Sequence, residues 1–66
     1  MAVLKVIEVL SNSTKSFEDA IEKAVKKADK TLKNIRSVNV KNMSVTVDSG
    51  KIKEYRVNLH LSFELE

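Results

Sequence analysis

The chain has 66 residues, with 12 Lys and Arg against nine Asp and Glu, a net charge of +3, and no cysteine. A chain of this length makes one domain, residues 1–66, that buries only about 60% of the surface its unfolded form exposes. The lack of Cys excludes disulfides and thiolate metal sites, and the single His60 excludes a histidine cluster for zinc. Association of several copies is the remaining way to stabilise so small a domain.

The excess of basic residues is modest and lacks the pattern of a nucleic-acid-binding surface. Such a surface combines a basic patch with aromatic side chains or a known motif, whereas this chain has three aromatic residues, Phe17, Tyr55 and Phe63. Lys5 and Glu8 interrupt the apolar run at the start, which therefore matches neither a signal peptide nor a membrane span. We expect a cytoplasmic protein without a nucleic-acid or membrane partner.

Residues 2–10 are rich in β-branched side chains and predict a strand, followed by a polar loop at residues 11–15. Both faces of this strand carry apolar side chains, which are Leu4, Val6 and Leu10 on one face and Val3, Ile7 and Val9 on the other. We therefore expect one face to pack against the rest of the chain and the other against a neighbouring subunit.

Residues 16–36 predict one long amphipathic helix with Ser16 as its N-cap. Apolar side chains recur at steps of three and four and so share one face: Phe17, Ala20, Ile21, Ala24, Val25, Ala28, Leu32 and Ile35. The lysines and glutamates occupy the remaining surface, which is typical of a solvated face.

Residues 37–48 and 51–66 predict two further strands joined by a turn at Gly50, where a positive φ is expected. The alternation of the first strand changes phase, which indicates a bulge near Lys41 and Asn42. The last strand alternates throughout, with an apolar row that covers the helix and a polar row formed by Glu54, Arg56, Asn58, His60, Ser62 and Glu64.

The order strand, helix, strand, strand defines an α+β fold in which a three-stranded sheet wraps on one long helix. A right-handed crossover makes the first two strands parallel, and the long last strand fits between them, antiparallel to both. One helix covers only one face of this sheet, so the bare face again favours assembly.

The polar row of the last strand gathers the most varied functional groups, but it contains no recognisable catalytic set. His60 lacks a nucleophile and an orienting partner, and Glu64 and Glu66 are explained by the solvated end of a strand. Arg56 is suited to bind a phosphate or carboxylate or to stack on a flat ring, and the alternative is an ion pair with a neighbouring carboxylate. We do not expect an enzyme.

Several short segments together resemble the dodecin family over essentially the whole chain. They are KVIEV at residues 5–9, SFEDAI at 16–21, KTLKNIR at 30–36, GKI at 50–52 with Tyr55, and FELE at 63–66. The resemblance implies a β-α-β-β subunit assembled into a hollow dodecamer. It also implies a non-enzymatic binding and storage protein for flavins such as riboflavin, lumichrome or FMN.

The resemblance also implies which residues line the flavin site. In typical members a Trp from each of two subunits stacks on paired flavin rings, and a Gln on the last strand binds the pyrimidine edge. Ser37 occupies the Trp position, Arg56 the Gln position, and Ser44 a position that is often basic. These three residues are the predicted cofactor-binding positions.

Since one aromatic stack contributes about 1–3 kcal/mol, we expect the loss of two to weaken flavin binding by tens to thousands of fold. The alternative is a cage of the same architecture that binds no flavin and serves a structural role or holds metal ions or anions.

Overall fold

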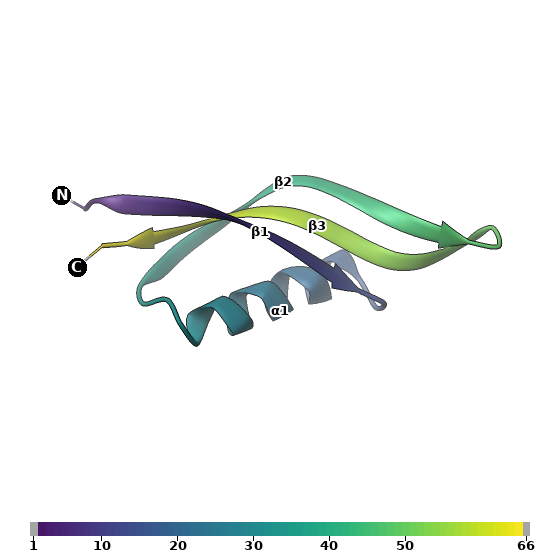
Figure 1. Cartoon of the computed structure of the whole chain (residues 1–66), viewed down its shortest axis with the longest axis horizontal. Helices are drawn as coiled ribbons and strands as arrows, with labels where there is room; N and C mark the ends of the chain where they lie inside the picture. The colour runs from purple at the N-terminus through teal and green to yellow at the C-terminus, as the bar shows by residue number, and fades with distance from the viewer. Residues whose placement is uncertain (1, 66) are drawn as a thin grey trace.

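The computed structural model describes residues 2–65 and contains three strands and one helix (Figure 1). In chain order these are β1 (Leu4–Ser13), α1 (Phe17–Asp29), β2 (Ile35–Asp48) and β3 (Lys51–Glu64). The sheet order is β1-β3-β2, and β3 pairs antiparallel with both neighbours. The predicted α+β fold is therefore confirmed, with a β-α-β-β order and the last strand at the centre of the sheet.

The start of α1 is fixed by side-chain hydrogen bonds that follow directly from the local sequence. Ser16 has extended backbone angles, and its hydroxyl accepts a 2.9 Å hydrogen bond from the Asp19 backbone N–H, as expected for an N-cap. The buried hydroxyl of Ser13 donates a 2.6 Å hydrogen bond to the Asp19 carboxylate and accepts one of 2.9 Å from the Lys15 N–H. The helix therefore begins where the sequence predicts.

The predicted loop at residues 11–15 is wrong in its first three residues, because β1 continues to Ser13. Ser11 and Ser13 pair with Val57 and Tyr55 of β3, and the Ser11 hydroxyl donates a 2.8 Å hydrogen bond to the Ala20 carbonyl. Strand pairing and these hydrogen bonds outweigh the turn preference of a polar run.

The predicted helix is also too long, because α1 ends at Asp29 rather than at residue 36. Asn34 adopts a left-handed φ of 62°, a conformation that Asn tolerates better than most residues, and this reverses the chain. Ile35 then belongs to β2 and pairs with Phe63. Apolar spacing alone did not separate the helix from the strand that follows it.

The predicted bulge in β2 is confirmed by a register shift between Val40 and Asn42, and two further shifts lie toward the ends of the strand. Ser49 and Gly50 form the turn with φ values of 52° and 75°. Positive φ at both central positions is typical of a type I′ hairpin, and Gly adopts it without steric cost.

The core lies between α1 and the middle of β3. Ala20 and Ala24 of the helix pack against Val57 and Leu59, and Leu59 is fully buried. Alanines at the contact let the helix approach the sheet closely. The core therefore consists of few side chains, as expected for a domain of this size.

Much apolar surface remains outside this core. On the face of the sheet opposite α1, Leu10 is 73% exposed and Leu4 and Val6 are more than half exposed. The β2–β3 hairpin also extends past the helix (Figure 1), and its exposed apolar residues are Met43, Val45, Val47 and Ile52. Exposed apolar patches of this kind are typical of interaction surfaces.

Replacing Leu59 with Ala tests the core. We expect Leu59→Ala to lower the free energy of unfolding by about 2–5 kcal/mol, because it removes a fully buried side chain and leaves a cavity. Urea denaturation at a fixed protein concentration measures this change. The control Lys53→Ala, at an exposed position of β3, should change stability by less than about 0.5 kcal/mol. Equal effects of the two substitutions would contradict this description of the core.

Candidate ligand-binding site

The polar row of β3 lies on the face of the sheet that α1 does not cover. Directly paired residues of antiparallel strands point to the same face, so each polar residue of β3 shares a rung with residues of β1 and β2. Arg56 lies between Asn12 and Ser44, and Ser62 pairs with Ser37. The uncovered face therefore presents polar side chains from all three strands.

Arg56 borders a small hollow of about 140 Å³, here called the polar notch. It is lined by Leu10, Asn12, Asn42, Ser44, Arg56, Val57 and Asn58. The Arg56 Nε donates a 3.3 Å hydrogen bond to the Asn12 side-chain oxygen. Within residues 2–65 Arg56 forms no ion pair, because its cross-strand neighbours are neutral. The expected alternative, an ion pair across the sheet, is therefore not formed inside the described chain.

The structure brings two of the three predicted site residues together and places the third far away. Ser44 and Arg56 face each other across one rung, whereas Ser37 hydrogen-bonds Ser62 near the other end of the sheet. Arg56 and Ser62 are six positions apart along β3, which corresponds to roughly 20 Å at about 3.3 Å per residue. A single chain therefore cannot bring all three residues to one small ligand.

Glu8 forms a charged cluster next to the notch that sequence reasoning did not identify. Its carboxylate lies 3.5 Å from the Lys41 Nζ and 3.6 Å from the His60 Nε2. Hydrogen bonding from the Asn58 side chain, followed by the charge of Lys41, holds the pKa of Glu8 below its ordinary value. Alternation along β1 is enough to predict that Glu8 faces away from the helix. Its contacts with Lys41 and His60 could not be predicted, because they depend on how the strands pair.

No group of three or more His, Cys, Asp or Glu within residues 2–65 is placed to hold a metal ion. Glu64 lies 3.5 Å from the Arg36 guanidinium, and Glu66 is outside the described residues. The part of the chain that the structure describes also contains no helix long and apolar enough to span a membrane.

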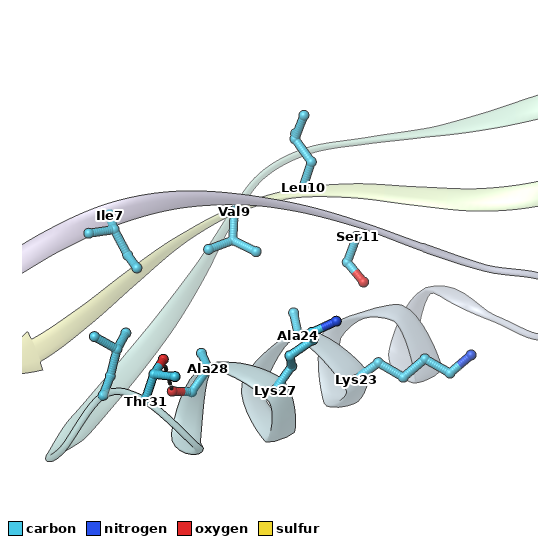
Figure 2. Close-up of a pocket in the computed structure, with 10 residues that line it drawn as sticks. Ile7, Val9, Leu10, Ser11, Lys23, Ala24, Lys27, Ala28 and Thr31 are labelled. Carbon is cyan, nitrogen blue, oxygen red and sulfur yellow. Dashed lines mark hydrogen bonds between the residues drawn. The ribbon is translucent and has the colours of Figure 1, made fainter.

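A second hollow, an apolar groove of about 470 Å³, lies between β1 and α1 (Figure 2). Ile7 and Val9 point toward the helix, whereas Leu10 points to the opposite face of the sheet. Lys23 and Lys27 extend from the helix beside the groove, and Lys23 is paired with Asp19 at 3.2 Å. The small helix residues Ala24 and Ala28 leave this space open.

A three-stranded antiparallel sheet packed on one helix, with an uncovered polar face, defines a small α+β protein whose predicted ligand residues are too widely spaced for one subunit. The Dodecin family model matches residues 3–66, and the chain belongs to this family. It is 36% identical over 64 residues to the dodecin of Thermus thermophilus, covering 97% of this chain and 93% of that protein. It is 35% identical over 65 residues to the calcium dodecin of Mycobacterium tuberculosis, covering 98% and 92%.

Solved structures show the same similarity. The crystal structure of an arginine-to-alanine mutant of T. thermophilus dodecin matches with a TM-score of 0.94 at 35% identity, covering 100% of this chain and 98% of that one. The crystal structure of the M. tuberculosis calcium dodecin, described as having a novel calcium-binding site, matches with a TM-score of 0.83 at 38% identity, covering 97% and 91%.

The cluster around Glu8 predicts a pH-dependent contribution to stability. Because its pKa is lowered in the folded chain, ionised Glu8 stabilises the fold above the ordinary carboxyl pKa, and this contribution is lost as the pH falls through the lowered value. We expect Glu8→Gln to lower the melting temperature at pH 7 and to have little effect at an acidic pH low enough to protonate wild-type Glu8. The control Glu22→Gln changes a carboxylate without an ion pair in residues 2–65, and its effect should depend less on pH. A Glu8→Gln effect of the same size at both pH values would contradict the prediction.

Proposed function

We propose that this protein is a non-enzymatic small-molecule binding and storage protein that holds a flavin-type ligand, FMN, riboflavin or lumichrome, between subunits of a hollow dodecamer. Ser37, Ser44 and Arg56 contribute to the site. Membership of the dodecin family supports this function, because the family binds small ligands.

The observation that carries the proposal is the placement of these residues on the uncovered sheet face. Ser44 and Arg56 share a rung, while Ser37 lies near the other end of the same face. Two copies packed through this face can bring Ser37 of one subunit near Arg56 of another, which one chain alone cannot do. The exposed Leu4, Val6 and Leu10 on that face offer apolar surface to a flat ring.

The apolar surface outside the core supports the assembly. Leu10 on the sheet face and the projecting β2–β3 hairpin are both exposed in the single chain. A domain of 66 residues with a core this small gains stability when such patches are buried between copies. Twelve subunits of 7.4 kDa give an assembly of about 89 kDa.

Equilibrium dialysis of FMN and riboflavin against ligand-stripped protein tests the function, and sedimentation tests the assembly mass. Without an aromatic side chain at Ser37 we expect binding that Ser37→Trp tightens by about tenfold or more, because the indole adds a stacking face worth about 1–3 kcal/mol. Ser37→Ala is the matched control, since it also removes the hydrogen bond to Ser62 but adds no ring. The absence of binding at near-millimolar flavin, by both the wild type and Ser37→Trp, would refute the flavin function.

A second candidate is an ion-binding cage that takes no flavin. The observation that favours it is the similarity to a relative described as a calcium dodecin. Because residues 2–65 contain no three-carboxylate group, the ligands would have to come from several subunits. A melting temperature that rises with millimolar calcium but not with magnesium would favour this candidate, whereas the flavin proposal predicts no such rise.

A further inference from the structure

We propose that the apolar groove between β1 and α1 is a second ligand site, which binds an ionised medium-chain fatty acid. The groove lies on the helix side of the sheet, whereas Ser44 and Arg56 lie on the uncovered face. The inference therefore goes beyond the proposed flavin function and does not depend on it.

The groove has the volume and the length of a small-molecule site. Its volume of about 470 Å³ falls within the range of about 300–1,000 Å³ that is usual for ligand pockets. Ile7 and Ser11 of β1 both line it, and they are four positions apart, which corresponds to roughly 13 Å at about 3.3 Å per residue. A groove that follows a strand for this distance suits an extended hydrocarbon chain.

Apolar side chains from both elements form the walls of the groove. Figure 2 shows Ile7 and Val9 pointing from β1 toward the helix, and Ala24 and Ala28 facing them from α1. Ile7 and Ala28 are half-buried, so a ligand chain between them would remove further apolar surface from water. Each methylene group buried in this way adds to the affinity.

The two hydroxyl groups that line the groove already donate to the helix backbone. Ser11 donates a 2.8 Å hydrogen bond to the Ala20 carbonyl, and Thr31 donates one of 3.4 Å to the Ala28 carbonyl. Because both hydroxyl protons are used, the walls offer little to a polar ring or a sugar and favour hydrocarbon.

Lysines supply the charge at the edge of the groove. Lys23 and Lys27 are the ionisable residues that line it within residues 2–65, and both extend from the helix beside it (Figure 2). Lys23 lies 3.2 Å from Asp19, whereas Lys27 forms no ion pair in the described part of the chain. An unpaired ammonium group beside an apolar groove complements a carboxylate at the end of a hydrocarbon chain, and it repels a cationic head group.

The β2–β3 hairpin of a second copy is the competing occupant, because its apolar side chains are exposed. Residues 43–54 of this hairpin carry Asp48 and Glu54 against Lys51 and Lys53, so their charges balance. A segment without net charge does not neutralise the lysines of the groove. The fatty acid therefore matches the groove better than the hairpin does.

Isothermal titration calorimetry of the full chain, in its native assembly, with sodium decanoate tests the site. We expect saturable binding of one decanoate per chain, whereas acetate, which lacks the chain, should not bind at the same concentrations. Decyltrimethylammonium carries the same chain with the opposite charge and should bind at least about fivefold more weakly. Absence of saturable decanoate binding, or equal affinities for the two head groups, would overturn the inference.

Substitutions test the charge and the groove separately. Lys27→Gln should weaken decanoate binding by about threefold to fivefold, as is typical of one surface ion pair, whereas the exposed Lys26, which does not line the groove, is the matched control. Ala28→Leu fills the groove and should weaken binding by at least about tenfold, whereas Glu22→Leu adds the same side chain outside it. The melting temperature of each variant confirms that it is folded. Equal effects of Lys27→Gln and Lys26→Gln, or binding that survives Ala28→Leu, would contradict the assignment.

Two further measurements separate this site from the alternatives. Excess FMN should leave decanoate binding unchanged, and displacement by FMN would make the groove part of the flavin site and overturn the inference. Sedimentation with saturating decanoate should show an unchanged assembly mass. A fall in mass would mean that the hairpin of a second copy occupies the groove, which would also overturn the inference. Decanoate binding is expected whether or not a flavin binds, so failure of the flavin function is recognised separately.

Discussion

The pairing of β3 with strands on both of its edges is the constraint on which the rest of the structure depends. Its buried residues Val57 and Leu59 form the sheet side of the core, and its polar residues alternate with them on the opposite face. Because side chains alternate strictly along a strand, one register fixes both the core and the ligand face. The same register places Asn12 and Ser44 on either side of Arg56.

Most of the fold follows from the sequence because its signals are local. The N-cap at Ser16, the turn at Gly50 and the alternation of the last strand each depend on a few neighbouring residues. The predicted boundary between the helix and the second strand was wrong because Leu32 and Ile35 continue the helical spacing beyond Asp29. The left-handed Asn34, which reverses the chain just before β2, gives only a weak sequence signal. The pairing of Ile35 with Phe63 of β3 places Ile35 in the strand rather than in the helix, and this pairing cannot be read from the sequence alone.

The site was harder to predict than the fold. The resemblance selected Ser37, Ser44 and Arg56, but the distance between them depends on which residues of β2 pair with β3. Asn12, Asn58 and Glu8 are ordinary polar residues of strands in the sequence. Only the register shows that Asn12 and Asn58 lie beside Arg56 and that Glu8 lies beside His60. The position often basic in the family is Ser44 here, and Arg56 lies directly across the rung from it. The positive charge at this pair of positions therefore lies on β3, at Arg56, rather than on β2, at Ser44.

The bulge at Val40 and Asn42 determines which side chains of β2 can take part in binding. Val38 and Val40 face the helix before the bulge, and Met43 continues on that face after it, because Lys41 adds one residue to the strand. If Lys41 instead paired regularly with Asn58, Met43 would stand opposite Arg56 and Ser44 would turn toward the helix side. The bulge therefore keeps the apolar side chains of β2 on the helix side of the sheet both before and after Lys41. A chain that lacked Lys41 would pair without a bulge and keep the same side chains on each face, whereas a chain that kept Lys41 in a regular ladder would exchange the two faces from this point on.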